Sequence, residues 1–170
     1  FKFQKNIKYP ISNIKCQRDG LLEYVGPKDA ETVIVAMGSV VGTIRHSVQE
    51  MCSDPTPTLP SKGRECVPPL SRRGIGGGSV GILKIKSFRP FPSEEIRKAL
   101  KNAKYVAVLE KAISLGNEGI LAGEIKQALY GTGIKVKGYV GGLGGRDVTR
   151  ENIREVIKDV RRKGEKVRFI

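Results

Sequence analysis

Residues 31–39, with the sequence ETVIVAMGS, decide the fold class of this chain. From Thr32 the segment is a continuous, β-branched apolar run, and it ends at the pair Gly38-Ser39. Short runs of this kind are typical of strands buried on both faces of a parallel sheet. Residues 42–51 then carry apolar side chains at spacings of four and three, which predicts a helix with one apolar stripe. Strand, glycine turn and helix together form a first βα unit.

The same alternation continues to the end of the chain. Further strands are predicted at residues 80–88, 105–110 and 136–140, and a helix is predicted after each of them. Strands that alternate with helices imply a mostly parallel sheet covered on both faces. The sequence therefore predicts an α/β fold with a doubly wound sheet, to which residues 21–25 are expected to add one more strand.

Two helix starts can be predicted from local chemistry. Proline has no N–H for a strand ladder, so Pro90 and Pro92 should end the strand before them. Ser93 then offers an N-cap for the next helix, and the last helix is expected to begin near Thr149 and Glu151.

We expect one domain over residues 21–170, which suits a chain of 170 residues. Residues 52–77 hold five of the nine prolines and little apolar periodicity, so we interpret them as a mobile insertion. The chain starts at Phe1 without an initiator methionine. We therefore interpret the chain as a piece of a longer protein, and residues 1–20 as the remnant of a connection from a preceding domain.

A formal net charge of +14 makes a polyanion a candidate partner. The cations are spread along the chain, however, and the few aromatic residues do not interleave with them as base-stacking platforms would. This pattern favours a basic solvated surface, or one matched to an acidic partner, over a nucleic-acid-binding module. No apolar run approaches the roughly 20 residues that span a bilayer, so we expect no membrane partner.

Candidate metal ligands and catalytic groups are sparse. The three cysteines, Cys16, Cys52 and Cys66, are odd in number and far apart, which favours a reducing cytoplasm over a disulfide scaffold. His46 is the only histidine, so we expect no metal or cluster site built within this chain. Glu110 is the carboxylate most expected to be partly buried, in an ion pair with the neighbouring Lys111. No nucleophile has a base beside it in the sequence, so we predict no catalytic residue.

Glycine-rich turns provide the candidate binding loops. The segment from Gly141 to Gly145 precedes Arg146-Asp147 and a helix, an arrangement that can cradle a phosphate. Its spacing fits neither dinucleotide nor Walker patterns, which favours a tight turn that packs on another domain and leaves a nucleotide-binding domain as an alternative. Such loops lie at the carboxyl edge of a parallel sheet, where open α/β folds gather their functional residues. The interface candidates are Gly38, Ser39, Arg89, Pro90, Gly144, Gly145, Arg146 and Asp147.

Four blocks of the sequence resemble one family. Residues 30–39, 83–92, 106–112 and 141–149 are similar, in the expected order, to the alpha subunit of pyruvate and related 2-oxoacid:ferredoxin oxidoreductases. The resemblance covers about 140 of the 170 residues once residues 52–77 are set aside. It implies a transketolase C-terminal-like domain, a three-layer αβα sandwich around a mostly parallel sheet.

The resemblance also implies the chemistry of the complete enzyme. In that family a 2-oxoacid is decarboxylated on thiamine diphosphate, electrons pass through iron–sulfur clusters to ferredoxin, and coenzyme A accepts the acyl group. Thiamine diphosphate, magnesium and the clusters would be held by other domains or subunits, with no cofactor in this chain. We therefore expect a non-catalytic scaffold or interface domain that is inactive alone, with the other subunits as its partners.

Overall fold

The computed structural model describes residues 17–18, 20–53, 79–115, 118–162, 164 and 167–170. Within these ranges the strands are β1 (Gln17–Arg18), β2 (Leu22–Val25), β3 (Thr32–Met37), β4 (Val80–Ile85), β5 (Tyr105–Glu110), β6 (Lys135–Val140) and β7 (Arg168–Phe169). The helices are α1 (Val40–Ser53), α2 (Ser93–Leu100), α3 (Ile120–Ala128), the 3₁₀ turn η1 (Leu143–Gly145) and α4 (Arg150–Asp159). The predicted insertion at 52–77 lies outside the described residues, apart from the end of α1. Most of the predicted connection at 1–20 also lies outside them, although Gln17–Arg18 pair with β2.

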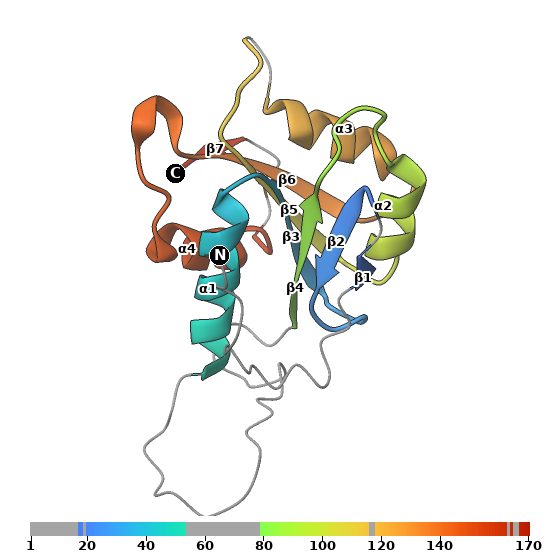
Figure 1. Cartoon of the computed structure of the whole chain (residues 1–170), viewed down its shortest axis with the longest axis horizontal. Helices are drawn as coiled ribbons and strands as arrows, with labels where there is room; N and C mark the ends of the chain where they lie inside the picture. Colours follow the sequence, from blue (N-terminus) through green and yellow to red (C-terminus); the bar gives the residue numbers. More distant parts are fainter. Residues whose placement is uncertain (1–16, 19, 54–78, 116–117, 163, 165–166) are drawn as a thin grey trace, which may run out of the picture.

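The strands form one sheet in the order β1-β2-β4-β3-β5-β6-β7 (Figure 1). The strands β4, β3, β5, β6 and β7 are mutually parallel, whereas β2 runs antiparallel to β4. The central strands begin together, because Thr32 is paired with Val80 on one side and with Tyr105 on the other. Their carboxyl ends therefore lie along one edge of the sheet, and the loops that follow them share that edge.

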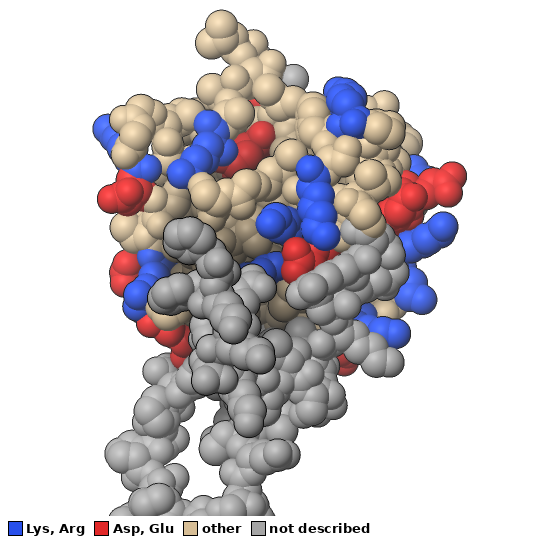
Figure 2. All heavy atoms as spheres, in the orientation of Figure 1, with Lys and Arg blue, Asp and Glu red and all other residues tan. Residues whose placement is uncertain are grey.

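Ion pairs join neighbouring elements on the surface. Glu23 of β2 lies 2.9 Å from Arg45 of α1, and Glu50 of α1 pairs with Arg150 of α4. On the face that Figure 2 presents, basic and acidic side chains of the described residues are interspersed. Each exposed pair contributes only about 0–1 kcal/mol to stability. The fold must therefore be stabilised mainly by its apolar layers.

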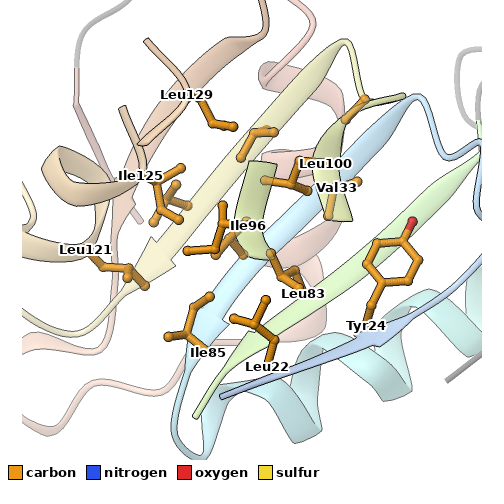
Figure 3. Packing of buried hydrophobic residues seen from close by; sticks show 14 of the residues in the cluster. Leu22, Tyr24, Val33, Leu83, Ile85, Ile96, Leu100, Leu121, Ile125 and Leu129 are labelled. Atoms are coloured by element: carbon orange, nitrogen blue, oxygen red, sulfur yellow. The ribbon is translucent and has the colours of Figure 1, made fainter. Parts of the chain in front are cut away.

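Helices cover the sheet on both faces. On one face α2 and α3 pack side chains such as Ile96, Leu100 and Ile125 against Val33 and Leu83 of the central strands (Figure 3). On the other face α1 and α4 pack against a second cluster of buried residues, Ile34, Ala36, Val40, Val41, Ile44, Val48, Ile82, Ala107, Leu109, Tyr139, Ile153, Val156, Ile157 and Val160. Full burial of a leucine, isoleucine or valine side chain contributes roughly 1.5–3 kcal/mol. The predicted three-layer, doubly wound α/β fold is confirmed.

Two details of the predicted elements are wrong. The strand predicted at 80–88 ends at Ile85, and its pairing with the chain before β2 continues only to Lys86, whose N–H donates to the Leu21 carbonyl (2.9 Å). Phe88 still packs against the core from the loop, which explains its strand-like apolar pattern. Ser93 is not an N-cap, because it is the first helical residue and Pro92 precedes it without any side-chain cap. The start predicted near Thr149 is confirmed, since Thr149 caps α4 through a capping box.

Candidate interface at the carboxyl edge of the sheet

The structure brings the predicted loop residues to one edge. Gly38-Ser39 follow β3, Arg89-Pro90 lie in the loop after β4, and residues 144–147 follow β6, all of them exposed. The chain leaves β3 toward β4 through α1 and leaves β5 toward β6 through α3, on the opposite face. This reversal makes the carboxyl ends of β3 and β5 a topological switch point, where open α/β sheets place their functional residues.

The glycines of this edge are required by backbone geometry. Gly38, Gly144 and Gly145 have φ values of 72°, 62° and 80°, in the left-handed region that other residues rarely adopt. Gly142 has φ 78°, and a β-carbon there would also come within 3.0 Å of the Lys111 Cε. The loop is therefore a tight strand-to-3₁₀ turn, against which the stem of Lys111 packs.

A depression of about 510 Å³ lies between this glycine loop and the end of the chain. It is lined by Val140, Gly141, Leu143, Gly144, Arg146, Phe169 and Ile170. Leu143 is 37% exposed and Phe169 is 60% exposed, so its walls include apolar surface in contact with water. Sequence reasoning did not connect β7 with the glycine loop, because a two-residue strand has no periodicity to detect.

The two arginines among the predicted interface residues differ in their surroundings. The Arg89 guanidinium lies 4.3 Å from the centroid of the Phe88 ring and 2.6 Å from Glu124 of α3, so it is held by its own domain. Within the described part of the chain, Arg146 and Asp147 form no ion pair. Arg146 is therefore the more available cation for a partner.

Glu110 has a structural role that the sequence did not reveal. Its side chain is buried, and its carboxylate accepts hydrogen bonds from the N–H groups of Leu121 (2.9 Å) and Ala122 (3.0 Å). These contacts cap the first turn of α3 from the end of β5, in place of the ion pair expected with Lys111. Burial raises the pKa of the Glu110 carboxyl, although the hydrogen bonds from α3 oppose that change.

Gly119 leaves the space that this carboxylate occupies. A β-carbon at Gly119 would lie 1.8 Å from the Glu110 Oε1, a distance that no folded structure tolerates. Glycine is therefore required at position 119, where the end of β5 and the start of α3 approach each other closely.

A second cluster, built around the buried Tyr139 and Asp159, joins β7 and α4 to β6. The Tyr139 hydroxyl donates to Asp159 Oδ2 (2.9 Å), Lys137 Nζ lies 2.7 Å from the same oxygen, and Arg168 lies 3.0 Å from Oδ1. Burial alone would raise the pKa of Asp159, but the hydrogen bonds and charges of these neighbours lower it overall. The i, i+2 spacing of Lys137 and Tyr139 indicates a shared face of β6, yet nothing in the sequence identifies Asp159 as their partner.

The described residues contain neither a metal-ligand cluster nor a membrane-spanning helix. No group of three or more His, Cys, Asp or Glu side chains in these ranges is arranged to hold a metal ion. No helix among them is both long and apolar enough to cross a membrane.

These features define a doubly wound α/β domain whose exposed loops, cations and apolar side chains gather at the carboxyl edge of the sheet. The chain belongs to the pyruvate:ferredoxin oxidoreductase core domain II family, because the model of that family matches residues 64–153. The resemblance stated from the sequence blocks is thereby confirmed. The matched range includes the second half of the segment interpreted as an insertion.

Curated relatives agree with the family match. The chain is 39% identical over 146 residues to the pyruvate synthase subunit PorA of Methanosarcina barkeri, and 38% identical over 143 residues to that of Methanocaldococcus jannaschii. It is 34% identical over 137 residues to the ketoisovalerate oxidoreductase subunit VorA of Pyrococcus horikoshii. These alignments cover 84%, 84% and 79% of this chain but only 31%, 31% and 29% of the relatives. The chain thus spans about a third of the length of the curated relatives it matches.

Proposed function

We propose that this chain is a non-catalytic scaffold and interface domain of a 2-oxoacid:ferredoxin oxidoreductase alpha subunit. The complete enzyme would decarboxylate a 2-oxoacid oxidatively on thiamine diphosphate, transfer the acyl group to coenzyme A and pass electrons to ferredoxin. The observation that carries the proposal is the alignment of 84% of this chain with 31% of a pyruvate synthase subunit. A segment that aligns almost throughout its own length with part of a longer subunit is expected to work as one of its domains.

The geometry of the carboxyl edge supports an interface role. The loops with Gly38, Ser39, Arg89, Pro90, Gly144, Gly145, Arg146 and Asp147 are exposed along this edge, where parallel α/β sheets place their working loops. Glu110 and Asp159, the carboxylates buried within the described ranges, both hold elements of the fold together. We assign the contacts with the other domains or subunits to the exposed edge.

The cofactors would be bound elsewhere in the enzyme. We assign thiamine diphosphate, magnesium and the iron–sulfur clusters to other domains or subunits, and coenzyme A and ferredoxin to the assembled complex. The cytoplasm is the proposed compartment, because the three cysteines are odd in number and widely spaced.

A domain exchange tests the proposal. The segment of the Methanosarcina barkeri PorA that matches this chain is replaced by this chain, and the hybrid is produced with the other subunits of that pyruvate synthase. We expect the hybrid enzyme to assemble and to reduce methyl viologen in the presence of pyruvate and coenzyme A, whereas this chain alone shows no such turnover. Turnover by the isolated chain, or a folded hybrid that never assembles, would refute the proposal.

The alternative of a polyanion-binding module has its own measurement. Nucleic-acid binding through phosphate contacts weakens steeply with salt, by roughly 10³–10⁵-fold between 50 and 200 mM for 6–10 contacts. We expect only weak, nonspecific binding of DNA by this chain at physiological salt. Tight DNA binding at physiological salt, together with a hybrid enzyme that fails to assemble, would favour the polyanion-binding module.

A further inference from the structure

We propose that the depression between the glycine loop and β7 binds an apolar, carboxylate-bearing segment from the rest of the alpha subunit. This inference rests on the proposed function. Leu143 and Phe169 would contact the apolar part of that segment, and Arg146 and Lys111 its carboxylates. The proposal concerns the chemistry of the contact, beyond the general assignment of an interface to this edge.

Large apolar side chains are exposed to water at this edge of the sheet. The described residues expose five large apolar side chains, and four of these, Leu115, Ile120, Leu143 and Phe169, belong to loops or element ends at the carboxyl edge. The fifth, Tyr130, follows the other end of α3. Scattered exposed apolar residues need no explanation, whereas Leu143 and Phe169 line one depression together, which favours an interaction site.

Most acidic side chains at this edge have partners within the domain, whereas two basic side chains do not form ion pairs with the described residues. Glu110 is engaged by α3, Glu118 lies 2.5 Å from Lys126, and Glu124 pairs with Arg89. By contrast, neither Lys111 nor Arg146 forms an ion pair with any described residue, and Asp147 is the only unpaired acid beside them. Lys111 and Arg146 are therefore exposed cations that can pair with carboxylates of a partner.

The depression is held in shape by backbone contacts. The Ile170 N–H donates to the Val140 carbonyl (3.0 Å), and the Gly141 N–H donates to the Glu110 carbonyl (3.0 Å). A β-carbon at Gly141 would lie 2.8 Å from Ile170 Cγ1, so the two walls are in close contact. A preformed surface loses little conformational entropy on binding, which favours a docking site.

A protein segment fits this depression better than a small molecule does. Small-molecule sites bury most of the ligand and orient it with a few precisely placed polar groups. Here the single charged side chain of the lining, Arg146, is exposed, and two of the apolar wall residues are exposed as well. Interfaces between domains have this composition, with an apolar centre and a charged rim.

The test measures binding in trans. The probe is the Methanosarcina barkeri pyruvate synthase assembled with a PorA chain from which the segment matching this chain has been deleted. The full 170-residue chain is titrated against it at two salt concentrations. We expect Arg146→Glu with Lys111→Glu to weaken binding about tenfold or more, and Phe169→Ser to weaken it by a similar factor.

The control is Lys28→Glu, which makes the charge change of one of these two substitutions in the exposed turn before β3, at the opposite edge. We expect it to leave binding within about twofold of wild type, and all variants to keep the wild-type melting temperature because the changed side chains are exposed. Leu143→Ser replaces Phe169→Ser if the latter disturbs β7.

Each outcome decides the inference. If wild type binds and the edge variants bind equally well, the inference is overturned while the proposed function stands. Equal weakening by Lys28→Glu would show general charge attraction, and displacement by millimolar phosphate or nucleotide would show a small-anion site; either overturns the inference. If the wild-type chain does not bind the probe at all, the proposed function and the inference fail together.

Discussion

Gly119→Ala should destabilise the domain through one identifiable contact. The new β-carbon would lie 1.8 Å from Glu110 Oε1 and 2.3 Å from its Cδ. The carboxylate is buried, so it cannot yield without losing its hydrogen bonds from Leu121 and Ala122. Hydrogen bonds to a charged group contribute about 1.5–3 kcal/mol each, and helix caps typically about 1 kcal/mol. We expect a loss of about 2–3 kcal/mol in the free energy of unfolding.

A double-mutant cycle isolates this contact. Glu110→Ala removes the carboxylate, so Gly119→Ala should cost little in that background, with a coupling energy of about 2 kcal/mol. Urea unfolding followed by circular dichroism measures all four variants, and a loss of 2 kcal/mol should lower the melting temperature by about 4–8 °C. The control is Gly123→Ala in the same helix, where a β-carbon meets nothing within 4 Å.

Gly123→Ala should instead increase the free energy of unfolding, because alanine is favoured over glycine inside a helix by about 0.5–1 kcal/mol. Two results would contradict this reasoning: a Gly119→Ala variant with the melting temperature of wild type, or additive effects of Gly119→Ala and Glu110→Ala. Either would mean that the carboxylate does not occupy the space at Gly119 and that Glu110 does not cap α3.

Three further predictions concern α4 and its contacts. Asp159→Asn should cost about 3 kcal/mol in urea unfolding at neutral pH, because Lys137 would keep a largely buried charge without its counterion; a loss below about 1 kcal/mol would contradict this. The pKa of Asp159 is lowered by folding, so its contribution to stability is present above the ordinary aspartate pKa and is lost as the pH falls through the lowered value. The stability of Asp159→Asn should therefore fall less than that of wild type over this acidic range. Thr149→Ala should cost about 1 kcal/mol by removing the capping box with Asn152, whereas Thr149→Ser should keep most of it.

The elements that were predicted correctly are determined by local features of the sequence. Residues 105–109 form a continuous apolar run of the kind typical of a strand buried on both faces, and β5 spans Tyr105–Glu110. The helix start near Thr149 was predicted because Glu151 suits the positive end of the helix dipole, and α4 begins there. The gathering of the loops at one edge followed from the parallel strands alone.

The missed contacts depend on tertiary position. Glu110 was expected to pair with its neighbour Lys111, but the N–H groups of α3 reach it first because the helix starts beside the end of β5. The cluster around Asp159 joins β6, α4 and β7, and no local pattern links those segments. Side-chain chemistry can be read from a sequence, whereas the partner of each side chain requires the fold.

The end of β5 connects the stability of the domain to the proposed docking surface. Glu110 points into the fold and holds α3, while the next residue, Lys111, is exposed and packs its stem against the glycine loop. Glu110→Ala should therefore lower the unfolding free energy and also loosen the backbone that positions Lys111. Lys111→Glu should weaken docking at unchanged stability, since it alters only an exposed charge. Two adjacent residues thus separate two causes of weaker assembly, and a binding defect can be assigned to the surface only when the melting temperature is that of wild type.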